Sequence, residues 1–379
     1  MYKIKLVQEN PKVGDIQGNF DLAKSYITEA KEENLDLIIF SEMFLTGYPP
    51  EDLLLRDDFL NESERVSKEL ENFSKDISIL IGCPTREGKD IYNSALFFQK
   101  GRLVKNYKKQ ILPNYKEFDE KRYFSRGDSY EILEDGGLKF GISICEDIWN
   151  EEFTKEIFKR EIDLLLNISA SPFTLDKKNL REKMLCNYFD DFKKPIIYVN
   201  QVGGQDELVF DGSSLVVNSK DSVRRLKSFE IDQAVIEINK KNISSDLKED
   251  QISNVGDISD IYKALVLGTR DYVQKNNFKG ILIGSSGGID SALTAAVATD
   301  ALGPEKVNTV MMPFRYTADM SIEDAQKLSK NLGFTHEVIP ISEMFNAFKN
   351  SLNEKLEPKE FDKTEENLQS RCRGVTLMA

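Results

Sequence analysis

Histidine is nearly absent from this chain, because its 379 residues include only His336. Serine–histidine and cysteine–histidine hydrolytic mechanisms need an imidazole beside the nucleophile. We therefore expect any hydrolytic site upstream of His336 to use a different base. His336 itself lies in the apolar run GFTHEVIPI, where we expect a packing or hydrogen-bonding residue and not a catalyst.

Paired cysteines and long apolar runs are missing as well. The four cysteines are widely spaced and form no CxxC pair, which argues against a disulfide framework and a zinc site. No run approaches the roughly 20 apolar residues needed to span a bilayer, and MYKIKLVQEN lacks a signal-peptide pattern. A net charge of −13 argues against nucleic acid or an anionic membrane as partner. We expect a cytoplasmic protein.

Short apolar runs alternate with amphipathic stretches over the first part of the chain, which predicts an α/β fold. Strands this apolar need cover on both faces, from helices or from a second sheet. The length indicates more than one domain. The polar segment KNISSDLKEDQISNVGDI reads as a linker. We expect domains at residues 1–240 and 259–379, joined by the linker 241–258.

A second alternation of strands and helices follows the expected linker. The runs GILIG, VNTVMM and HEVIPI read as strands, and the segments between them read as helices. Ser321 opens one of these helices with a capping-box pattern. This order predicts a doubly wound, Rossmann-like parallel sheet of about three strands.

Three predicted strands of the first part end at polar residues. LDLIIF leads to Glu42, RLVKNY to Lys108, and KFGISI to Cys145. Catalytic groups gather beyond strand ends in layered sheet proteins, so these three side chains could share a pocket. A buried carboxylate could then deprotonate the thiol, and the lysine could stabilise the thiolate and an oxyanion. Two solvated charges and a small buried thiol remain the alternative from spacing alone.

The residues around these positions resemble a known family. SEMFLTGYPPEDLL, KNYKKQILPNYKEFDEKRYFSRG and GISICEDIW are similar, in this order, to the three motifs of the nitrilase, or carbon–nitrogen hydrolase, superfamily. The resemblance implies a catalytic triad of Glu42, Lys108 and Cys145, with Glu120 as a second glutamate that supports the lysine. It also implies an α-β-β-α sandwich.

The run after the nucleophile, CEDIW, resembles the glutaminase branch attached to NAD synthetases. That resemblance implies that Glu146 and Trp149 hold glutamine, and that Tyr115, Ser171 and Lys177 contact it too. A carboxylate can hold an α-ammonium group and a cation can hold an α-carboxylate. Packing of the Tyr115 ring and a turn role for the Ser171 hydroxyl are the alternatives.

A glycine–serine turn follows the strand GILIG. Its small residues and the helix start behind it suit a pyrophosphate group, and Asp290 among phosphates calls for Mg²⁺ between them. The expected ATP-binding residues are Gly284, Ser285, Ser286, Gly287, Gly288, Ile289, Asp290 and Ser291.

The sequence SGGIDS resembles the signature of N-type ATP pyrophosphatases, and EENLQSRCRG resembles a later helix of NAD synthetases. The resemblance implies that Arg371 contacts deamido-NAD or ATP, whereas a solvated helix face is the alternative. The implied reaction joins the two parts: deamido-NAD, ATP, glutamine and water give NAD, AMP, pyrophosphate and glutamate. It also implies homo-oligomers and an internal ammonia channel.

The chain stops at Ala379 inside a predicted helix, so we expect a synthetase domain cut short, and a chain that hydrolyses glutamine without making NAD. Three other functions stay open at this point. The chain could be a stand-alone amidase, an amidotransferase with another adenylated acceptor, or a non-catalytic scaffold.

Overall fold

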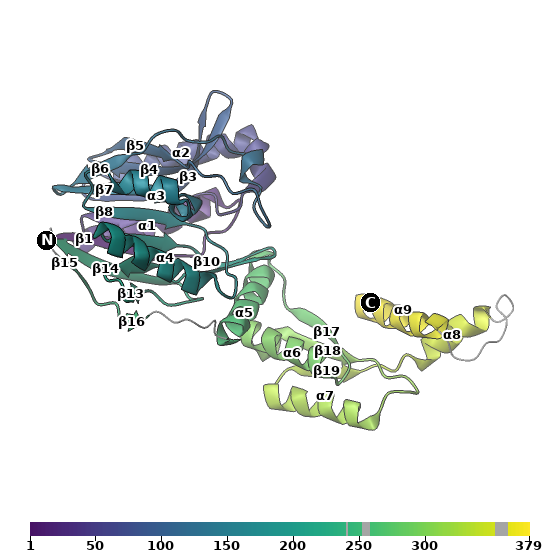
Figure 1. The fold of residues 1–379 in the computed structure, drawn as a ribbon. Coiled ribbons are helices and arrows are strands. Elements are labelled where there is room, and N and C mark those ends of the chain that lie inside the picture. The colour runs from purple at the N-terminus through teal and green to yellow at the C-terminus, as the bar shows by residue number, and fades with distance from the viewer. Residues whose placement is uncertain (240–241, 252–257, 353–362) are drawn as a thin grey trace. The chain divides into compact units, whose positions relative to one another are not determined.

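The computed structural model describes residues 1–239, 242–251, 258–352 and 363–379 (Figure 1). These residues form two compact units, Met1–Ala264 and Leu265–Ala379. None of the described helices is long and apolar enough to cross a membrane.

Two seven-stranded sheets make up the first unit within the described residues. The first sheet has the order β15 (Asn242–Ser245), β14 (Asp232–Asn239), β1 (Tyr2–Gln8), β2 (Leu37–Ile39), β3 (Ser78–Glu87), β4 (Asp90–Gln99) and β5 (Arg102–Lys108). The second has the order β16 (Glu249–Gln251), β13 (Ser222–Arg225), β12 (Leu215–Val217), β9 (Ile196–Asn200), β8 (Leu164–Ser169), β7 (Leu138–Ile144) and β6 (Ile132–Asp135). A short hairpin pairs β10 (Val202–Gln205) with β11 (Leu208–Asp211).

Side chains alternate between the two faces of the first sheet, as a strand dictates. In β2, Leu37 and Ile39 belong to the apolar core shared with the second sheet. Ile38 between them packs instead with residues of α1 (Ile16–Glu32) and α2 (Asp57–Phe73). On the second sheet, α3 (Glu151–Phe158) and α4 (Lys177–Phe192) supply the outer layer (Figure 1). The expected α-β-β-α sandwich is therefore confirmed.

The linker expected at 241–258 is wrong in its described part. β15 pairs with β14 and β16 pairs with β13, so both strands belong to the sheets of the first unit. They are outermost strands with one neighbour each. Edge strands tolerate polar residues because one side faces away from the sheet, and this explains the weak apolar pattern. Residues 252–257 lie outside the described residues.

A parallel sheet of β17 (Ile281–Ser285), β18 (Val307–Met311) and β19 (Thr335–Val338) forms the second unit. Its helices are α5 (Ile258–Lys275), which begins in the first unit, α6 (Ile289–Leu302), α7 (Asp319–Leu332), α8 (Ser342–Leu352) and α9 (Lys363–Met378). Short 3-10 helices are η1 (Glu51–Leu55), η2 (Glu120–Arg122) and η3 (Cys145–Trp149) in the first unit and η4 (Pro304–Lys306) in the second.

Helices cover both faces of this parallel sheet. Val307 packs with residues of α6 and α7, whereas Val310 packs with residues of α8 and α9. The Rossmann-like, doubly wound prediction is therefore confirmed. The capping box expected at Ser321 is wrong, because α7 already begins at Asp319. His336 Nδ1 lies 2.7 Å from the hydroxyl of Thr309, which confirms its hydrogen-bonding role.

Candidate active site

Glu42 lies just beyond the end of β2, which pairs in parallel with β1 and β3. Its side chain is fully buried. Oε1 accepts hydrogen bonds from Lys109 Nζ at 2.8 Å and from Asn93 Nδ2 at 2.7 Å. Oε2 accepts the backbone N–H of Ala170 at 2.7 Å. A buried carboxylate held by three donors has a fixed orientation.

The expected position of Lys108 in this pocket is wrong, and Lys109 takes it. Lys108 is the last residue of β5, and its Nζ lies 2.6 Å from Glu87 and 4.1 Å from the centre of the Tyr92 ring. Lys109 is 1% exposed. Tyr107 packs in the core between the sheets, and strand residues two apart share a face. Lys109 therefore continues on the inward side of Tyr107, and Lys108 points away from it.

Glu120 in η2 completes the charged array. Its Oε1 accepts a hydrogen bond from Lys109 Nζ at 2.7 Å and one from the Tyr48 hydroxyl at 2.9 Å. Burial raises the pKa of Glu120 to about 7. The cation of Lys109 lowers this pKa, and the negative charge of Glu42 raises it further. Burial opposes the charge of Lys109, but Glu120 and Glu42 hold its pKa well above the usual value. One cation is thus held between two carboxyl groups.

Cys145 lies where β7 ends and η3 begins. Its backbone has φ +43°, which L side chains rarely adopt and which marks functional sites in many enzymes. Burial and the charge of Glu42 raise the pKa of the Cys145 thiol above its ordinary value, while Lys109 and Lys177 lower it. A thiol with a raised pKa is protonated at neutral pH and needs a base to become a nucleophile.

Charged groups of both signs flank the thiol. Glu146 follows Cys145 and accepts a hydrogen bond from the Tyr115 hydroxyl at 2.8 Å. Lys177 begins α4, and its Nζ lies 5.4 Å from the centre of the Phe118 ring. An acidic and a basic group on either side of a nucleophile can together hold an amino acid by its α-ammonium and α-carboxylate groups.

Trp149 and Ser171 differ in their surroundings. Trp149 is partly buried and packs against the core between the sheets. Ser171 is fully buried, and its N–H donates to Asn200 Oδ1 at 2.8 Å. Its hydroxyl interacts with that of the buried Tyr198, whose pKa is raised by burial and lowered to a smaller extent by this interaction.

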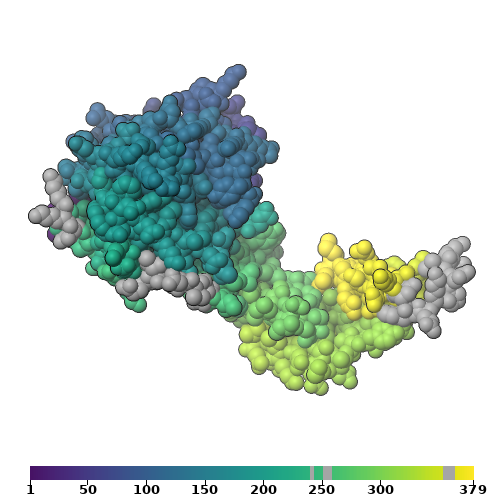
Figure 2. Space-filling view, viewed as in Figure 1, coloured from purple at the N-terminus to yellow at the C-terminus, as the bar shows by residue number. Residues whose placement is uncertain are grey.

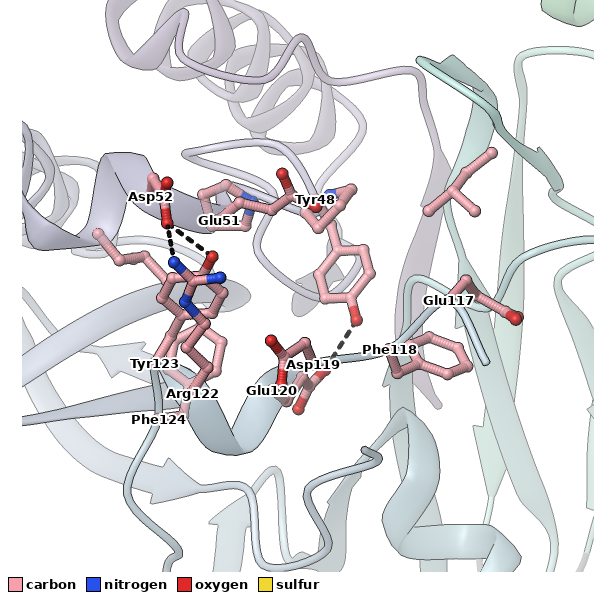
Figure 3. A pocket seen from close by; sticks show the side chains of 14 residues that line it. Tyr48, Glu51, Asp52, Glu117, Phe118, Asp119, Glu120, Arg122, Tyr123 and Phe124 are labelled. Carbon is pink, nitrogen blue, oxygen red and sulfur yellow. Dashed lines mark hydrogen bonds and ion pairs between the residues drawn. The ribbon is translucent and has the colours of Figure 1, made fainter. Parts of the chain in front are cut away.

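A cavity of about 210 Å³ has Glu120 among its lining residues (Figure 3). Tyr48 points its hydroxyl toward Glu120 at one wall. At another wall, Asp52 accepts the Tyr123 hydroxyl at 2.8 Å and lies 3.3 Å from Arg122. Glu42, Lys109 and Cys145 are not among the residues that line this cavity, so the open space lies at the Glu120 end of the array.

The glycine–serine turn of the second unit lies between β17 and α6. Gly287 has φ +76°, and a Cβ there would lie 2.2 Å from the Ser321 carbonyl oxygen, so glycine is required. Ser286 and Ser291 hydroxyls lie 3.1 Å apart, and the Gly288 N–H donates to Ser286 Oγ. Asp290 and Ile289 stand exposed in the first turn of α6.

A cavity of about 450 Å³ opens beside this turn. Its lining comprises Gly284, Ser285, Ser286, Met311, Met312, Pro313, Thr317, Arg373 and Leu377. Arg373 Nε also donates to the Met312 carbonyl oxygen at 3.2 Å. Arg371 lies on the exposed side of α9, the yellow helix in Figure 2, and is not among the lining residues. The cavity combines an apolar wall, the first residues of the glycine–serine turn and one guanidinium group, which suits a nucleotide. The residues from Gly287 to Ser291 are not among its lining residues.

Comparison with known proteins identifies both units. Residues 3–229 match the carbon-nitrogen hydrolase family and residues 261–379 match the NAD synthase family. The glutamine-dependent NAD(+) synthetase of Acinetobacter baylyi is 41% identical over 382 residues, which cover all of this chain and 70% of that protein. The chain belongs to the glutamine-dependent NAD(+) synthetases. The Thermotoga maritima relative is 38% identical, with 72% of its length covered.

Solved structures agree with this family. The synthetase of Acinetobacter baumannii in complex with ADP superimposes with a TM-score of 0.92 at 38% identity, over all of this chain and 72% of that one. An amidase from Nesterenkonia sp. shares the fold of the first unit, with a TM-score of 0.58 at 23% identity over 63% of this chain.

Several residues of this synthetase's candidate site were not predicted from the sequence. Lys109, Asn93 and Tyr48 contact the carboxyl array directly. The alternation of side chains along the strand ending in NYKK could have identified Lys109, had Tyr107 been taken as an inward residue. No local pattern identifies Asn93 or Tyr48, because their contacts join strands and loops far apart in the sequence.

Proposed function

We propose that the chain hydrolyses glutamine to glutamate and ammonia through a thioester on Cys145, and that its second unit serves the amidation of adenylated deamido-NAD by this ammonia, with ATP cleaved to AMP and pyrophosphate. That the chain as given performs only the hydrolysis stays a prediction from the sequence. The observation that carries the proposal is the buried Glu42–Lys109–Glu120 array beside the Cys145 thiol, in a chain of this synthetase family.

The hydrolytic steps follow from the contacts. Glu42 accepts the Cys145 proton, and the thiolate attacks the side-chain amide carbon of glutamine. Lys109 has three N–H donors; two bond to the carboxyl groups, and the third stabilises the oxyanion. Glu42 returns the proton to the nitrogen, ammonia leaves, and the thioester forms. Glu42 then deprotonates a water that attacks the thioester carbon, releasing glutamate and restoring the thiol.

Substrate selection is assigned to the groups around the thiol. Glu146 and Tyr115 hold the α-ammonium group, and Lys177 with the Ser171 hydroxyl holds the α-carboxylate. Trp149 supports this side of the pocket by its packing. Simple amides lack both charged groups and would leave these residues without partners, so they should be poor substrates.

In the second unit, the turn from Ser285 to Ser291 binds the ATP phosphates and the cavity lined by Met312 and Arg373 binds the nucleoside part. Magnesium commonly uses one carboxylate together with substrate phosphates, and Asp290 fits that requirement because it is exposed beside the turn. The ion would neutralise phosphate charge there. Arg371 as a contact of deamido-NAD, a homo-oligomer, an ammonia channel and a cytoplasmic location stay predictions from the sequence.

A substrate panel tests the proposal. Ammonia release is measured with glutamine, asparagine, propionamide and butyramide, and NAD, AMP and pyrophosphate are measured with ATP and deamido-NAD added. We expect glutamine to exceed the simple amides in kcat/KM by 10³-fold or more, about the discrimination of a site that binds polar substrate groups. Preference for a simple amide would support the stand-alone amidase instead.

A further inference from the structure

Asp147, two residues after Cys145, has a fully buried carboxyl group with four hydrogen-bond donors around it. Oδ1 accepts the backbone N–H groups of Gln110 at 3.0 Å and Ile111 at 2.8 Å. Oδ2 accepts the Tyr107 hydroxyl at 2.7 Å and the N–H of Ile144 at 2.9 Å. A buried carboxylate is stable only when its oxygens are satisfied in this way.

These donors come from the two segments that carry the reactive groups. Tyr107, Gln110 and Ile111 lie on both sides of Lys109, whereas Ile144 directly precedes Cys145. One carboxylate therefore ties the β5 end to the β7 end. The positive φ of Cys145 needs neighbouring structure to hold it, and the bond to Ile144 acts at the adjoining residue.

We infer that Asp147 is a positioning residue that sets Lys109 against the Cys145 thiol and thereby determines the rate of the chemical step. This inference rests on the proposed amide hydrolysis and adds a residue that touches neither the substrate nor the thiol. All four partners are donors, so both carboxyl positions must be acceptors. An asparagine at position 147 would place an NH₂ group at one of these two positions. That group would face N–H or O–H donors and could not accept their hydrogen bonds.

The test replaces this carboxylate and measures three quantities. In Asp147→Asn, we expect kcat for glutamine to fall about 100-fold, the cost of a small misplacement of reacting groups, while KM stays within about threefold. Iodoacetamide should also alkylate Cys145 several-fold more slowly, because a displaced Lys109 stabilises the thiolate less. The alkylation rate does not depend on glutamine being the substrate.

Glu182→Gln is the matched control. Glu182 is a buried carboxylate of α4 whose Oε2 accepts from Arg225 at 3.1 Å, so this variant also loses buried polar contacts. We expect it to lower the melting temperature while kcat and the alkylation rate stay unchanged. Equal losses of kcat and alkylation rate in both variants, or none in Asp147→Asn, would overturn the inference.

Tyr107→Phe covers the case in which Asp147→Asn does not fold. It removes one of the four bonds and leaves the carboxylate, and we expect kcat to fall several-fold at unchanged KM. If Asp147→Asn does not fold and Tyr107→Phe has an unaltered kcat, the inference about Asp147 is also overturned. If the unaltered chain alkylates normally but releases no ammonia from glutamine, the proposed function fails and the alkylation rates still decide the role of Asp147.

Discussion

At the scale of single residues, Lys108 and Lys109 are neighbours with opposite surroundings. Lys109 lies buried between Glu42 and Glu120, and Lys108 forms a partly exposed ion pair with Glu87. Of these two lysines, Lys109 is the one placed to act on a thiolate or an oxyanion in the proposed reaction. The adjacent pair therefore gives a matched comparison of a buried and a partly exposed lysine.

We expect Lys109→Met to lower kcat for glutamine about 100- to 1000-fold, the usual effect of losing a group that stabilises an oxyanion. Its removal also leaves two buried carboxyl groups without their cation, which costs about 3–5 kcal/mol of unfolding free energy. Lys108→Met should stay within about twofold in kcat, since partly exposed ion pairs contribute little. Ammonia release is measured below the lower melting temperature, and equal losses in both variants would contradict the assignment.

The Glu120 carboxyl group links stability to pH. Its pKa is about 7 in the folded chain against an ordinary value of 4.5, so between these values the folded state holds a proton that the unfolded state has lost. The unfolding free energy should therefore fall as pH rises from about 4.5 to 7.

Urea unfolding at pH 4.5 and pH 7.5 checks this effect. We take the unfolding free energy of the unaltered chain minus that of Glu120→Gln. This difference should be smaller at pH 7.5 than at pH 4.5 by a few kilocalories per mole. A difference that rises with pH for Glu120 would contradict the effect of burial.

At the scale of strands and helices, Gly82 in β3 allows the chain around Glu42 to approach closely. A Cβ at this position would lie 2.2 Å from the backbone nitrogen of Met43 and 2.5 Å from the carbonyl oxygen of Ser41. Backbone must then move, and Glu42 moves with it.

We expect Gly82→Ala to destabilise the chain by about 1–3 kcal/mol, as overpacking does, and to lower kcat tenfold or more. Gly374→Ala in α9 should leave kcat unchanged and should raise stability by up to about 1 kcal/mol, because a Cβ there meets no atom within 4 Å and alanine favours the helix over glycine. Thermal unfolding and ammonia release measure the two effects. Unaltered kcat in Gly82→Ala would show that Glu42 tolerates the shift.

The central strands could be predicted from the sequence because burial on both faces makes them apolar. β2 lies within the expected strand LDLIIF, and β7 contains the expected strand KFGISI. The edge strands β15 and β16 could not be predicted, since one-sided pairing leaves them polar. Glu42 and Glu120 were expected to lie together, and both contact Lys109; their catalytic roles and that of Cys145 stay predictions. The error at Lys108 arose because the sequence does not show which face of the strand each lysine occupies. That face depends on the strand's register, which composition does not determine.

At the scale of the whole molecule, the chain combines a carbon–nitrogen hydrolase unit with an NAD synthase unit. The first unit supplies ammonia in the proposed reaction and the second consumes it. Each half can be measured separately, since glutamine hydrolysis and nucleotide binding have their own readouts.

Nucleotide binding distinguishes two nearby arginines of α9. Arg373 lines the cavity beside the glycine–serine turn, whereas Arg371 lies exposed. Arg373→Ala should weaken ADP binding about tenfold or more, as the loss of a charge-assisted contact does, and Arg371→Ala should leave it within twofold. Titration calorimetry with ADP measures both. A larger loss in Arg371→Ala would assign the nucleotide contact to the exposed arginine.

The most direct test of the proposed hydrolysis is a search for the thioester. The chain is mixed with glutamine, quenched with acid within milliseconds to seconds, and its intact mass and its peptides are measured beside a Cys145→Ala chain, with ammonia release followed in parallel. We predict one glutamyl group on the peptide that contains Cys145, and no ammonia release from the alanine variant. Ammonia release from Cys145→Ala at the rate of the unaltered chain would contradict the account.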